Sequence, residues 1–208
     1  MLKRIAHELK EHIPFTAIGA LTGIAIMAAV VLGHVPAHIS HTAFYISHPL
    51  HVLLSALVTT AMYMRYRRAR LWAAILIGWT GSIGIATISD AFLPYLSGSL
   101  LNAQMEFHVP FIEEWWINLV ALAGIAIGYR KQATKIPHFG HVLVSTWASL
   151  FYFTAFGIAD WIHLLPLIFL FLFLSVWIPC CTSDIIYPLL FVREKRELYA
   201  PERQEIAS

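Results

Sequence analysis

Long apolar stretches separated by short polar segments make up most of this chain. A helix needs about 20 consecutive apolar residues to cross the hydrocarbon core of a bilayer, because backbone N–H and C=O groups cannot be left unpaired in lipid. Six stretches qualify, at about residues 15–32, 43–63, 71–93, 111–129, 142–157 and 162–180. The pattern therefore predicts an all-α, polytopic membrane protein with six transmembrane helices.

The composition agrees with a lipid environment. Of the 208 residues, 59% are hydrophobic and only 12% are charged, whereas an average soluble domain carries about 25% charged residues. Residues 1–14 are charged, and the apolar run that follows is too long for the core of a signal peptide. We therefore expect no cleavable leader.

Positive charge is confined to one side of this predicted topology. All 14 Lys and Arg residues precede the first stretch, follow the sixth, or lie between the second and third or the fourth and fifth. Because cytoplasmic loops collect Lys and Arg, we expect both termini in the cytoplasm and the protein in the plasma (cytoplasmic) membrane. The expected partners are the lipid bilayer, metal ions and either a second copy of the chain or a larger membrane complex, but no nucleic acid.

Three short motifs occur twice, in the same order, at offsets of 96, 90 and 94 residues. They are His-x-Pro-Phe at His12 and His108, His-x-x-His at His48–His51 and His138–His141, and Ser-Asp followed by Pro at Asp90 and Asp184. Three matches in one register predict an internal duplication.

Each copy would hold three spans, so the second copy must be inserted upside down relative to the first. We assign residues 1–100 and 101–192 to the two inverted repeats and residues 193–208 to a polar cytoplasmic tail. Inverted repeats of this kind occur in many secondary transporters.

The repeated polar residues predict two metal sites, one near each membrane face. Residues three apart on a helix share one face, and three imidazoles with one carboxylate form a zinc-type ligand shell. Zn is the first expectation, and Fe, Mn, Co, Ni or Cu also suit nitrogen and oxygen ligands. The outer site comprises His48, His51, Asp90 and His108, and the inner site comprises His12, His138, His141 and Asp184. Ser89 and Ser183 are expected to orient ligands.

Other polar residues on the predicted outer side are auxiliary candidates. His34, His38 and His41 are expected on a loop, where they would capture cations, and Glu106, Glu113 and Glu114 would complete or feed the outer site. The adjacent Cys180 and Cys181 are expected to be thiols rather than a disulfide, and we interpret them first as small apolar helix residues.

A divalent transition-metal transporter is the leading functional hypothesis, with protons competing for the imidazoles because these titrate near neutral pH. Its weakness is that sites at opposite faces differ from the midplane site usual in inverted-repeat carriers.

Three alternatives remain open. One is a membrane metalloenzyme at the outer face, with Glu113 or Glu114 as general base. Another is a di-haem electron-transfer subunit, in which His48 or His51 would pair with His108, and His138 or His141 with His12. The third is a purely structural subunit.

Overall fold

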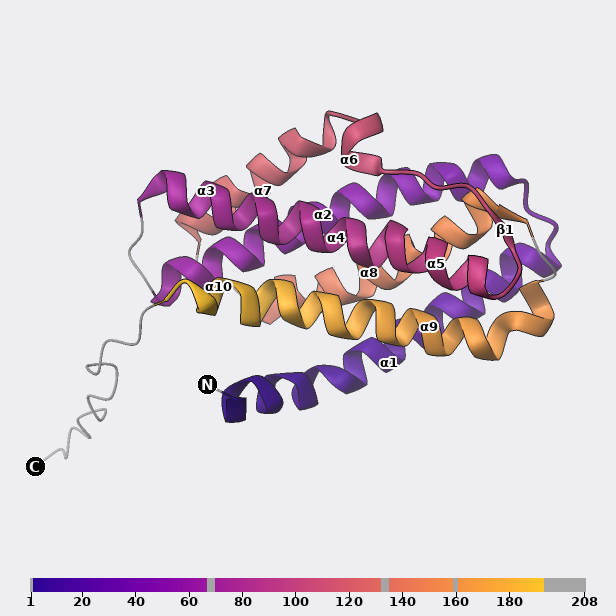
Figure 1. Ribbon diagram of the computed structural model, residues 1–208, viewed down its shortest axis with the longest axis horizontal. Coiled ribbons are helices and arrows are strands. Elements are labelled where there is room, and N and C mark those ends of the chain that lie inside the picture. Colours follow the sequence, from indigo (N-terminus) through magenta and orange to yellow (C-terminus); the bar gives the residue numbers. More distant parts are fainter. Residues whose placement is uncertain (1, 67–69, 132–134, 159–160, 193–208) are drawn as a thin grey trace, which may run out of the picture.

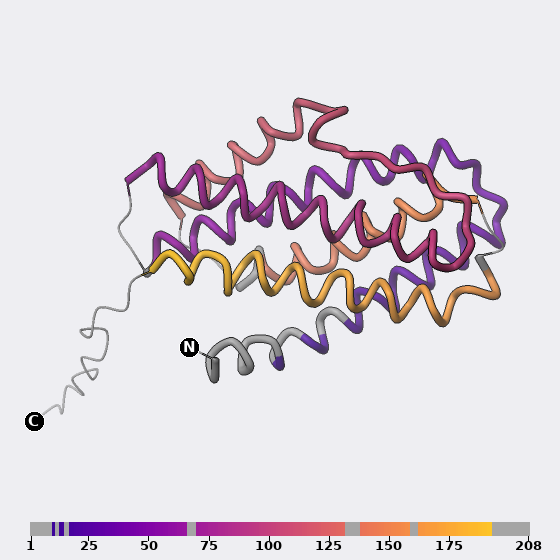
Figure 2. Tube along the Cα trace, viewed as in Figure 1, coloured from indigo at the N-terminus to yellow at the C-terminus, as the bar shows by residue number. Residues whose placement is uncertain are grey.

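The computed structural model is a bundle of long helices that lie roughly along one axis (Figures 1 and 2). It describes residues 2–66, 70–131, 135–158 and 161–192. The predicted tail, 193–208, is outside these residues. Two long helices open the chain, α1 (Leu2–Leu32) and α2 (Ala37–Tyr66).

A continuous helical rod follows from Leu71 to Leu100 and contains two π-helical segments. Its parts are α3 (Leu71–Trp79), η1 (Thr80–Gly84), α4 (Ile85–Thr87), η2 (Ile88–Phe92) and α5 (Leu93–Leu100). A second rod ends the described chain and comprises α9 (Trp161–Cys181), η3 (Thr182–Ile186) and α10 (Tyr187–Leu190).

Further helices and two short strands lie between the rods in the sequence. The helices are α6 (Pro110–Glu113), α7 (Ile117–Arg130) and α8 (Lys135–Phe156). The strands, β1 (Gln104–Met105) and β2 (Gly157–Ile158), pair in antiparallel fashion. They join the connection after α5 to the end of α8 at one end of the bundle (Figure 1).

Two of the π-helical segments have a visible cause in the sequence. Pro94 and Pro188 lie four residues after Asp90 and Asp184. Proline has no N–H, so neither can donate the regular helical hydrogen bond to the carbonyl of the preceding Asp. The regular α-helical hydrogen-bond pattern is therefore interrupted in η2 and η3, the segments that carry the two Asp residues. Such π-helical turns are frequent at functional sites.

The centre of the bundle is formed by α2 and α8, which pack against each other. Helix α1 packs on α8 and α9, whereas α7 packs on α2 and α3. Close approach depends on glycine: a Cβ placed on Gly124 or Gly128 of α7 would lie 2.4 or 2.3 Å from a carbonyl oxygen of α2. On α1, a Cβ at Gly19 or Gly23 would lie 2.9 or 3.3 Å from a side-chain atom of Thr146 of α8. Small residues four apart are the common device for tight helix contacts in membranes.

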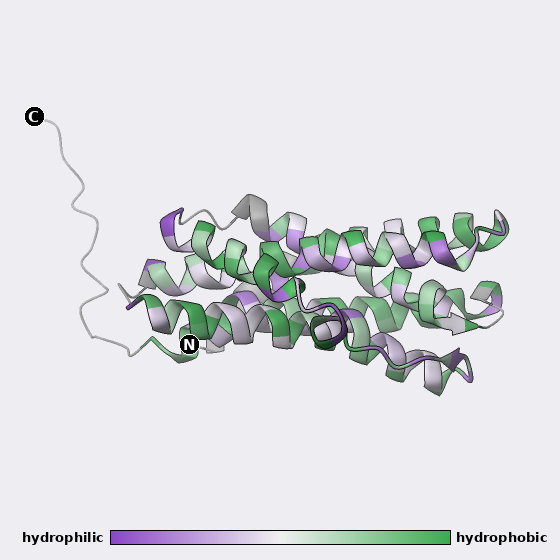
Figure 3. Cartoon of the chain, turned by 90° about the horizontal axis from the view of Figure 1, so that it is seen from above, coloured by the Kyte–Doolittle hydropathy of each residue, from purple (hydrophilic) through white to green (hydrophobic). Residues whose placement is uncertain are grey.

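Apolar side chains cover the outside of the bundle, and polar ones lie inside. Leu21, Trp72, Leu119 and Ile178 are each more than half exposed, and apolar residues run along most of each helix (Figure 3). Among the described residues, twenty polar ones are buried instead. This distribution is the reverse of a water-soluble protein and suits a lipid surround.

Four helical segments are long and apolar enough to cross a membrane, namely Ala37–Arg65, Leu71–Leu100, His138–Phe156 and Ile162–Leu190. Two shorter apolar helices, Ala17–Leu32 and Ile117–Arg130, accompany them. The predicted all-α class is thus confirmed, and four helical segments are suited to crossing a membrane.

Several predicted boundaries are wrong because helices continue past the apolar runs. Helix α2 begins at Ala37 rather than at residue 43, so His38 and His41 lie in its first turns and not on a loop. The third segment continues to Leu100, and the fourth is interrupted between α6 and α7. Polar residues at a helix end still form backbone hydrogen bonds, so hydropathy alone does not mark where a helix stops.

Candidate metal centre

The first polar group at the core of the bundle joins α2 to η2. The Oδ2 atom of Asp90 lies 2.9 Å from Nδ1 of His48 and 2.5 Å from Nδ1 of His51. All three side chains are buried. The His-x-x-His spacing places both rings on one face of α2, and the π-helical turn brings the carboxylate to them.

A second group with the same composition joins α8 to η3. The Oδ2 atom of Asp184 lies 2.6 Å from Nδ1 of His138 and 2.6 Å from Nδ1 of His141. His141 and Asp184 are fully buried, and His138 nearly so. Each predicted cluster thus keeps its two His residues and its Asp in direct contact.

Hydroxyl groups donate hydrogen bonds to the second oxygen of each carboxylate. Asp90 Oδ1 accepts hydrogen bonds from Ser89 (2.8 Å) and from Ser145 of α8 (2.9 Å). Asp184 Oδ1 accepts one from Thr59 of α2 at 3.5 Å. Ser89 thus orients a carboxylate directly, while Ser183 donates to the carbonyl of Gly81.

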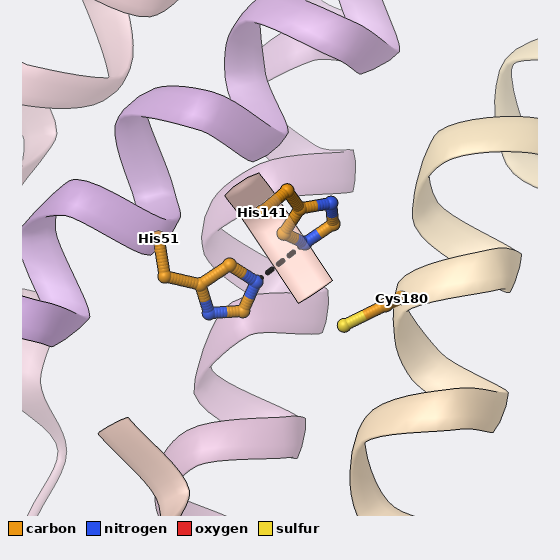
Figure 4. A group of neighbouring side chains, drawn as sticks. All are labelled: His51, His141 and Cys180. Atoms are coloured by element: carbon orange, nitrogen blue, oxygen red, sulfur yellow. Dashed lines mark hydrogen bonds between the residues drawn. The ribbon is translucent and has the colours of Figure 1, made fainter. Parts of the chain in front are cut away.

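The two groups meet at the centre of the bundle. Nε2 of His51 lies 2.6 Å from Nε2 of His141, and the rings are nearly parallel with centroids 4.5 Å apart (Figure 4). The prediction of separate sites near opposite membrane faces is therefore wrong. The motifs were placed at the ends of the apolar runs, whereas α2 extends well beyond its run and carries His51 to its middle.

The hydrogen bonds to the carboxylates indicate which nitrogen of each imidazole carries the hydrogen. An ionised carboxylate only accepts hydrogen bonds, so Nδ1 of each of the four histidines carries the hydrogen that faces Asp90 or Asp184. The Nε2 lone pairs of His51 and His141 are then directed at each other. A proton shared between the two nitrogens accounts for the 2.6 Å contact as a hydrogen bond, and a metal ion could take the place of that proton after a small separation of the rings. A carboxylate on Nδ1 is the usual support of a metal-binding histidine.

Cys180 on α9 lies beside this pair (Figure 4). Its Sγ atom and a nitrogen each of His51 and His141 are all within 4.8 Å of one another, and all three residues are buried. The thiol donates a hydrogen bond to Ser145 Oγ at 3.4 Å. Our sequence interpretation of Cys180 as a small apolar residue missed this position. The available signal was its spacing, since Cys180 precedes Asp184 by four residues and shares its helix face.

Two more triads of donor atoms have the compactness of metal sites: His48, His51 and Asp90, and His138, His141 and Asp184. Nε2 of His48 is buried and has no hydrogen-bond partner among the residues that the structure describes. The core therefore offers nitrogen, oxygen and sulfur donors within a few ångströms.

His108 lies apart from these groups. Its Nε2 contacts the hydroxyl of Tyr45, and its Nδ1 lies 2.5 Å from Oε2 of Glu113. The ring of Phe44 stacks on His48 and meets the edge of His108. Burial lowers the pKa of His108 below its ordinary value of 6.5, and the Glu113 carboxylate opposes this shift.

The remaining predicted residues lie outside the central group or outside the described side chains. The side chain of His12 is not among those described. His34, His38 and His41 are exposed, as are Glu106 and Glu113, while Glu114 accepts a hydrogen bond from the indole of Trp116. Nε2 of His51 faces His141 rather than His108, and the ring of Phe44 lies against both His48 and His108.

We compared the chain with protein-family models, with curated proteins and with solved structures, and none of them matches it. The functional argument therefore depends on geometry. Buried His, Asp and Cys side chains in a bundle apolar enough for a membrane form a group that could hold a metal ion.

Proposed function

We propose that this protein carries a divalent transition-metal ion across a membrane and binds it where His51 and His141 meet. The observation that carries the proposal is the convergence of two Nε2 atoms, 2.6 Å apart, each on a ring whose Nδ1 is held by a buried Asp. Two neutral imidazoles fixed in this way present lone pairs to one point, which is what a cation requires.

The donor set indicates which ions fit. Imidazole nitrogen suits Zn, Cu, Fe and Ni, whereas Mg and Ca prefer shells made of oxygen. Zn stays our first expectation, with Fe, Mn, Co, Ni and Cu as the others to test. Asp90 and Asp184 would orient the rings rather than bind the ion, since their Oδ2 atoms already accept two hydrogen bonds each.

The arrangement of the two halves supports a carrier. We propose that residues 1–100 and 101–192 are inverted repeats, because equivalent contacts cross between them. Thr59 of α2 donates to Asp184 Oδ1, and Ser149 of α8, 90 residues later, donates to Asp90 Oδ1. In the same way α1 packs on α8 and α9, and α7 packs on α2 and α3. Carriers of this architecture bind substrate near the midplane, between the repeats. The meeting of the two His groups removes the weakness that sites at opposite faces would have had.

Ligands divided between the halves suggest how release would occur. His51 comes from α2 and His141 from α8, so rocking one half against the other would separate the two nitrogens and weaken the site. Both side chains are at most 1% exposed, so an ion reaches them only through such a movement. Binding and opening would therefore be linked by one displacement.

The expected orientation is consistent with the placement of charge. We propose that the protein lies in the plasma membrane, crosses it six times and has both termini in the cytoplasm. The ends of α2, α7 and α10 and the start of α3 lie at the same end of the bundle (Figure 1). Arg65, Arg70, Arg130 and Lys131 occur at or beside these helix ends, as the positive-inside rule expects.

Reconstituted liposomes containing a metal-sensitive dye test the proposal. We expect uptake of at least one ion among Zn, Mn, Fe, Co, Ni and Cu, and its loss in His51→Ala and His141→Ala. The exposed His163 of α9 provides the matched control, His163→Ala, which should retain uptake. Absence of flux for every ion, in protein shown to be folded, would overturn the transport proposal.

The alternative functions draw less support from the geometry. The bases suggested for an outer-face enzyme are engaged elsewhere, Glu113 with His108 and Glu114 with Trp116. A visible spectrum of the purified protein tests the haem hypothesis, because a bound haem would give a Soret band.

A further inference from the structure

We infer that the Cys180 sulfur is a third ligand of the central ion, which makes the site selective for thiophilic metal ions. This inference depends on the proposed metal site between His51 and His141. Among the divalent ions, it favours those that bind thiolate well, such as Zn²⁺, over Mn²⁺.

The geometry requires only small movements. Metal bonds of about 2.0–2.1 Å to nitrogen and about 2.3 Å to sulfur place donor atoms roughly 3.3–3.6 Å apart in a tetrahedral shell. The two Nε2 atoms are 2.6 Å apart, and Sγ of Cys180 lies within 4.8 Å of one nitrogen of each ring. Side-chain shifts of about 1 Å would therefore bring all three atoms to bonding distance.

The three ligands come from three different helices, α2, α8 and α9 (Figure 4). Because the ligands are on separate helices, the position of the third ligand, Cys180, depends on how α9 packs against the other two. Helix α9 is fixed beside α8 by direct contact, and both pack on α1. Cys180 is 1% exposed, so water does not compete with the sulfur for the ion.

The hydrogen bond of the thiol leaves its lone pairs available. Cys180 directs its S–H toward Ser145 Oγ, which in turn donates to Asp90 Oδ1. Metal binding would form the metal–sulfur bond and release the thiol proton, which would leave by the same opening of the two halves that admits the ion. Ser145 would thus hold both a ligand and the carboxylate that orients His51.

The neighbouring Cys181 is a matched control within the same helix. It is also buried, at 1% exposure, but it is not part of the group formed by His51, His141 and Cys180. Consecutive residues on a helix point about 100° apart. A cysteine effect that depends on the metal should therefore be specific to position 180.

Spectroscopy of the full chain in detergent, loaded with Co²⁺ alone, tests the inference. We expect a thiolate-to-cobalt charge-transfer band in the near ultraviolet. Cys180→Ser should abolish this band and weaken Zn²⁺ binding roughly tenfold or more, since even the loss of an outer hydrogen-bond partner costs 10- to 100-fold. Cys181→Ser should leave the band and the affinity unchanged.

Selectivity is the second readout. The unaltered protein should prefer Zn²⁺ to Mn²⁺ in competition, and Cys180→Ser should narrow that preference. X-ray absorption at the zinc edge of the unaltered protein should show a sulfur neighbour at about 2.3 Å. This measurement does not depend on how well a variant folds.

The outcomes separate this inference from the proposed function. Metal bound without a sulfur neighbour, with Cys180→Ser binding as tightly as the unaltered protein, would overturn the role of Cys180 and leave the histidine site standing. If the unaltered protein shows a sulfur neighbour but Cys180→Ser prefers Zn²⁺ to Mn²⁺ as strongly as the unaltered protein does, the claim that Cys180 makes the site selective would be wrong. No binding of Co²⁺ or Zn²⁺ by the unaltered protein would overturn both.

Discussion

At the level of single residues, Asp90 and Asp184 fix the orientation of the four core histidines through hydrogen bonds to Nδ1 of each ring. Each carboxylate uses one oxygen for two imidazoles, and hydroxyl groups donate to the other. Burying these two carboxylates costs less free energy because hydrogen-bond partners that are fixed by packing surround them. Removing either carboxylate would free two rings at once.

We therefore expect Asp90→Asn to weaken Zn²⁺ binding by roughly 10- to 100-fold, because the amide no longer holds Nδ1 of His51 as a negative acceptor. Titration calorimetry in detergent measures this. Asp184→Asn should give a loss of similar size if the two halves contribute equally. The exposed Glu106→Gln serves as a charge-removal control. Unchanged affinity in both Asp variants would show that they do not support the ligands.

His108 and Glu113 form an ion pair outside the central group, with Nδ1 of His108 2.5 Å from Oε2 of Glu113. Burial lowers the pKa of His108 below 6.5, and the Glu113 carboxylate partly opposes this. Because the folded pKa is below the unfolded one, stability is fully present above about pH 6.5 and is lost as pH falls through the folded pKa. Glu113→Gln removes the opposing charge, so we expect the His108 pKa to fall further. Histidine NMR measures the shift, and thermal unfolding should show a steeper loss between about pH 7 and pH 5. A rise in the His108 pKa would contradict the expectation.

At the level of helices, the prolines after each Asp connect sequence to site geometry. Pro94 forces the hydrogen-bond ladder at Asp90 to rearrange, and the carboxylate sits in the resulting π-turn. The stability of the helix and the affinity of the site should therefore respond in opposite directions when this proline is replaced.

For Pro94→Ala we expect a restored backbone donor, a more regular helix and a displaced Asp90. Thermal unfolding should show equal or greater stability, while Zn²⁺ affinity falls. Pro166→Ala in α9 provides a control, since that proline is inside a helix but exposed. Equal affinity in Pro94→Ala and the unaltered protein would mean that the π-turn does not position the carboxylate.

The contact between α7 and α2 depends on the absence of side chains. A Cβ at Gly124 would lie 2.4 Å from the carbonyl oxygen of Leu53, so the backbones would have to separate. We expect Gly124→Ala to destabilise the fold by about 1–3 kcal/mol, the usual cost of overpacking. A Cβ at Gly84 would meet no atom within 4 Å, so Gly84→Ala should be nearly neutral. Thermal unfolding in one detergent compares them, and equal melting temperatures would contradict the tight contact.

At the level of the whole molecule, the sequence predicted the all-α class and six of the residues that the structure groups into the candidate metal centre. Apolar length identified the helices, and the duplicated motifs identified His48, His51, Asp90, His138, His141 and Asp184. The sequence did not predict how far the histidines lie from the ends of the bundle. Hydropathy does not show that α2 begins well before His48, which places His51 near the middle of the helix. Cys180 was also missed, since a lone cysteine in an apolar helix looks like a packing residue until α9 is placed beside α2 and α8.

The number of spans is the main question at this scale. If α1 and α7 both cross the membrane, the α1–α2 connection and the α7–α8 connection lie on opposite sides. If only Ala37–Arg65, Leu71–Leu100, His138–Phe156 and Ile162–Leu190 cross, both connections lie on the same side. The connection after α5 lies on the same side as the α1–α2 connection in either case, which provides an internal reference.

Single cysteines in a Cys180→Ser, Cys181→Ser background distinguish these arrangements. The exposed positions are His34→Cys, Asn102→Cys and Lys131→Cys. With six spans, an impermeant maleimide added to intact cells should label positions 34 and 102, and should label 131 only after permeabilisation. The reason is the clustering of basic residues at one end of the bundle, which retains that end in the cytoplasm. Labelling of all three positions from the same side would show four spans, and would place the two halves in a relation that inverted repeats cannot have.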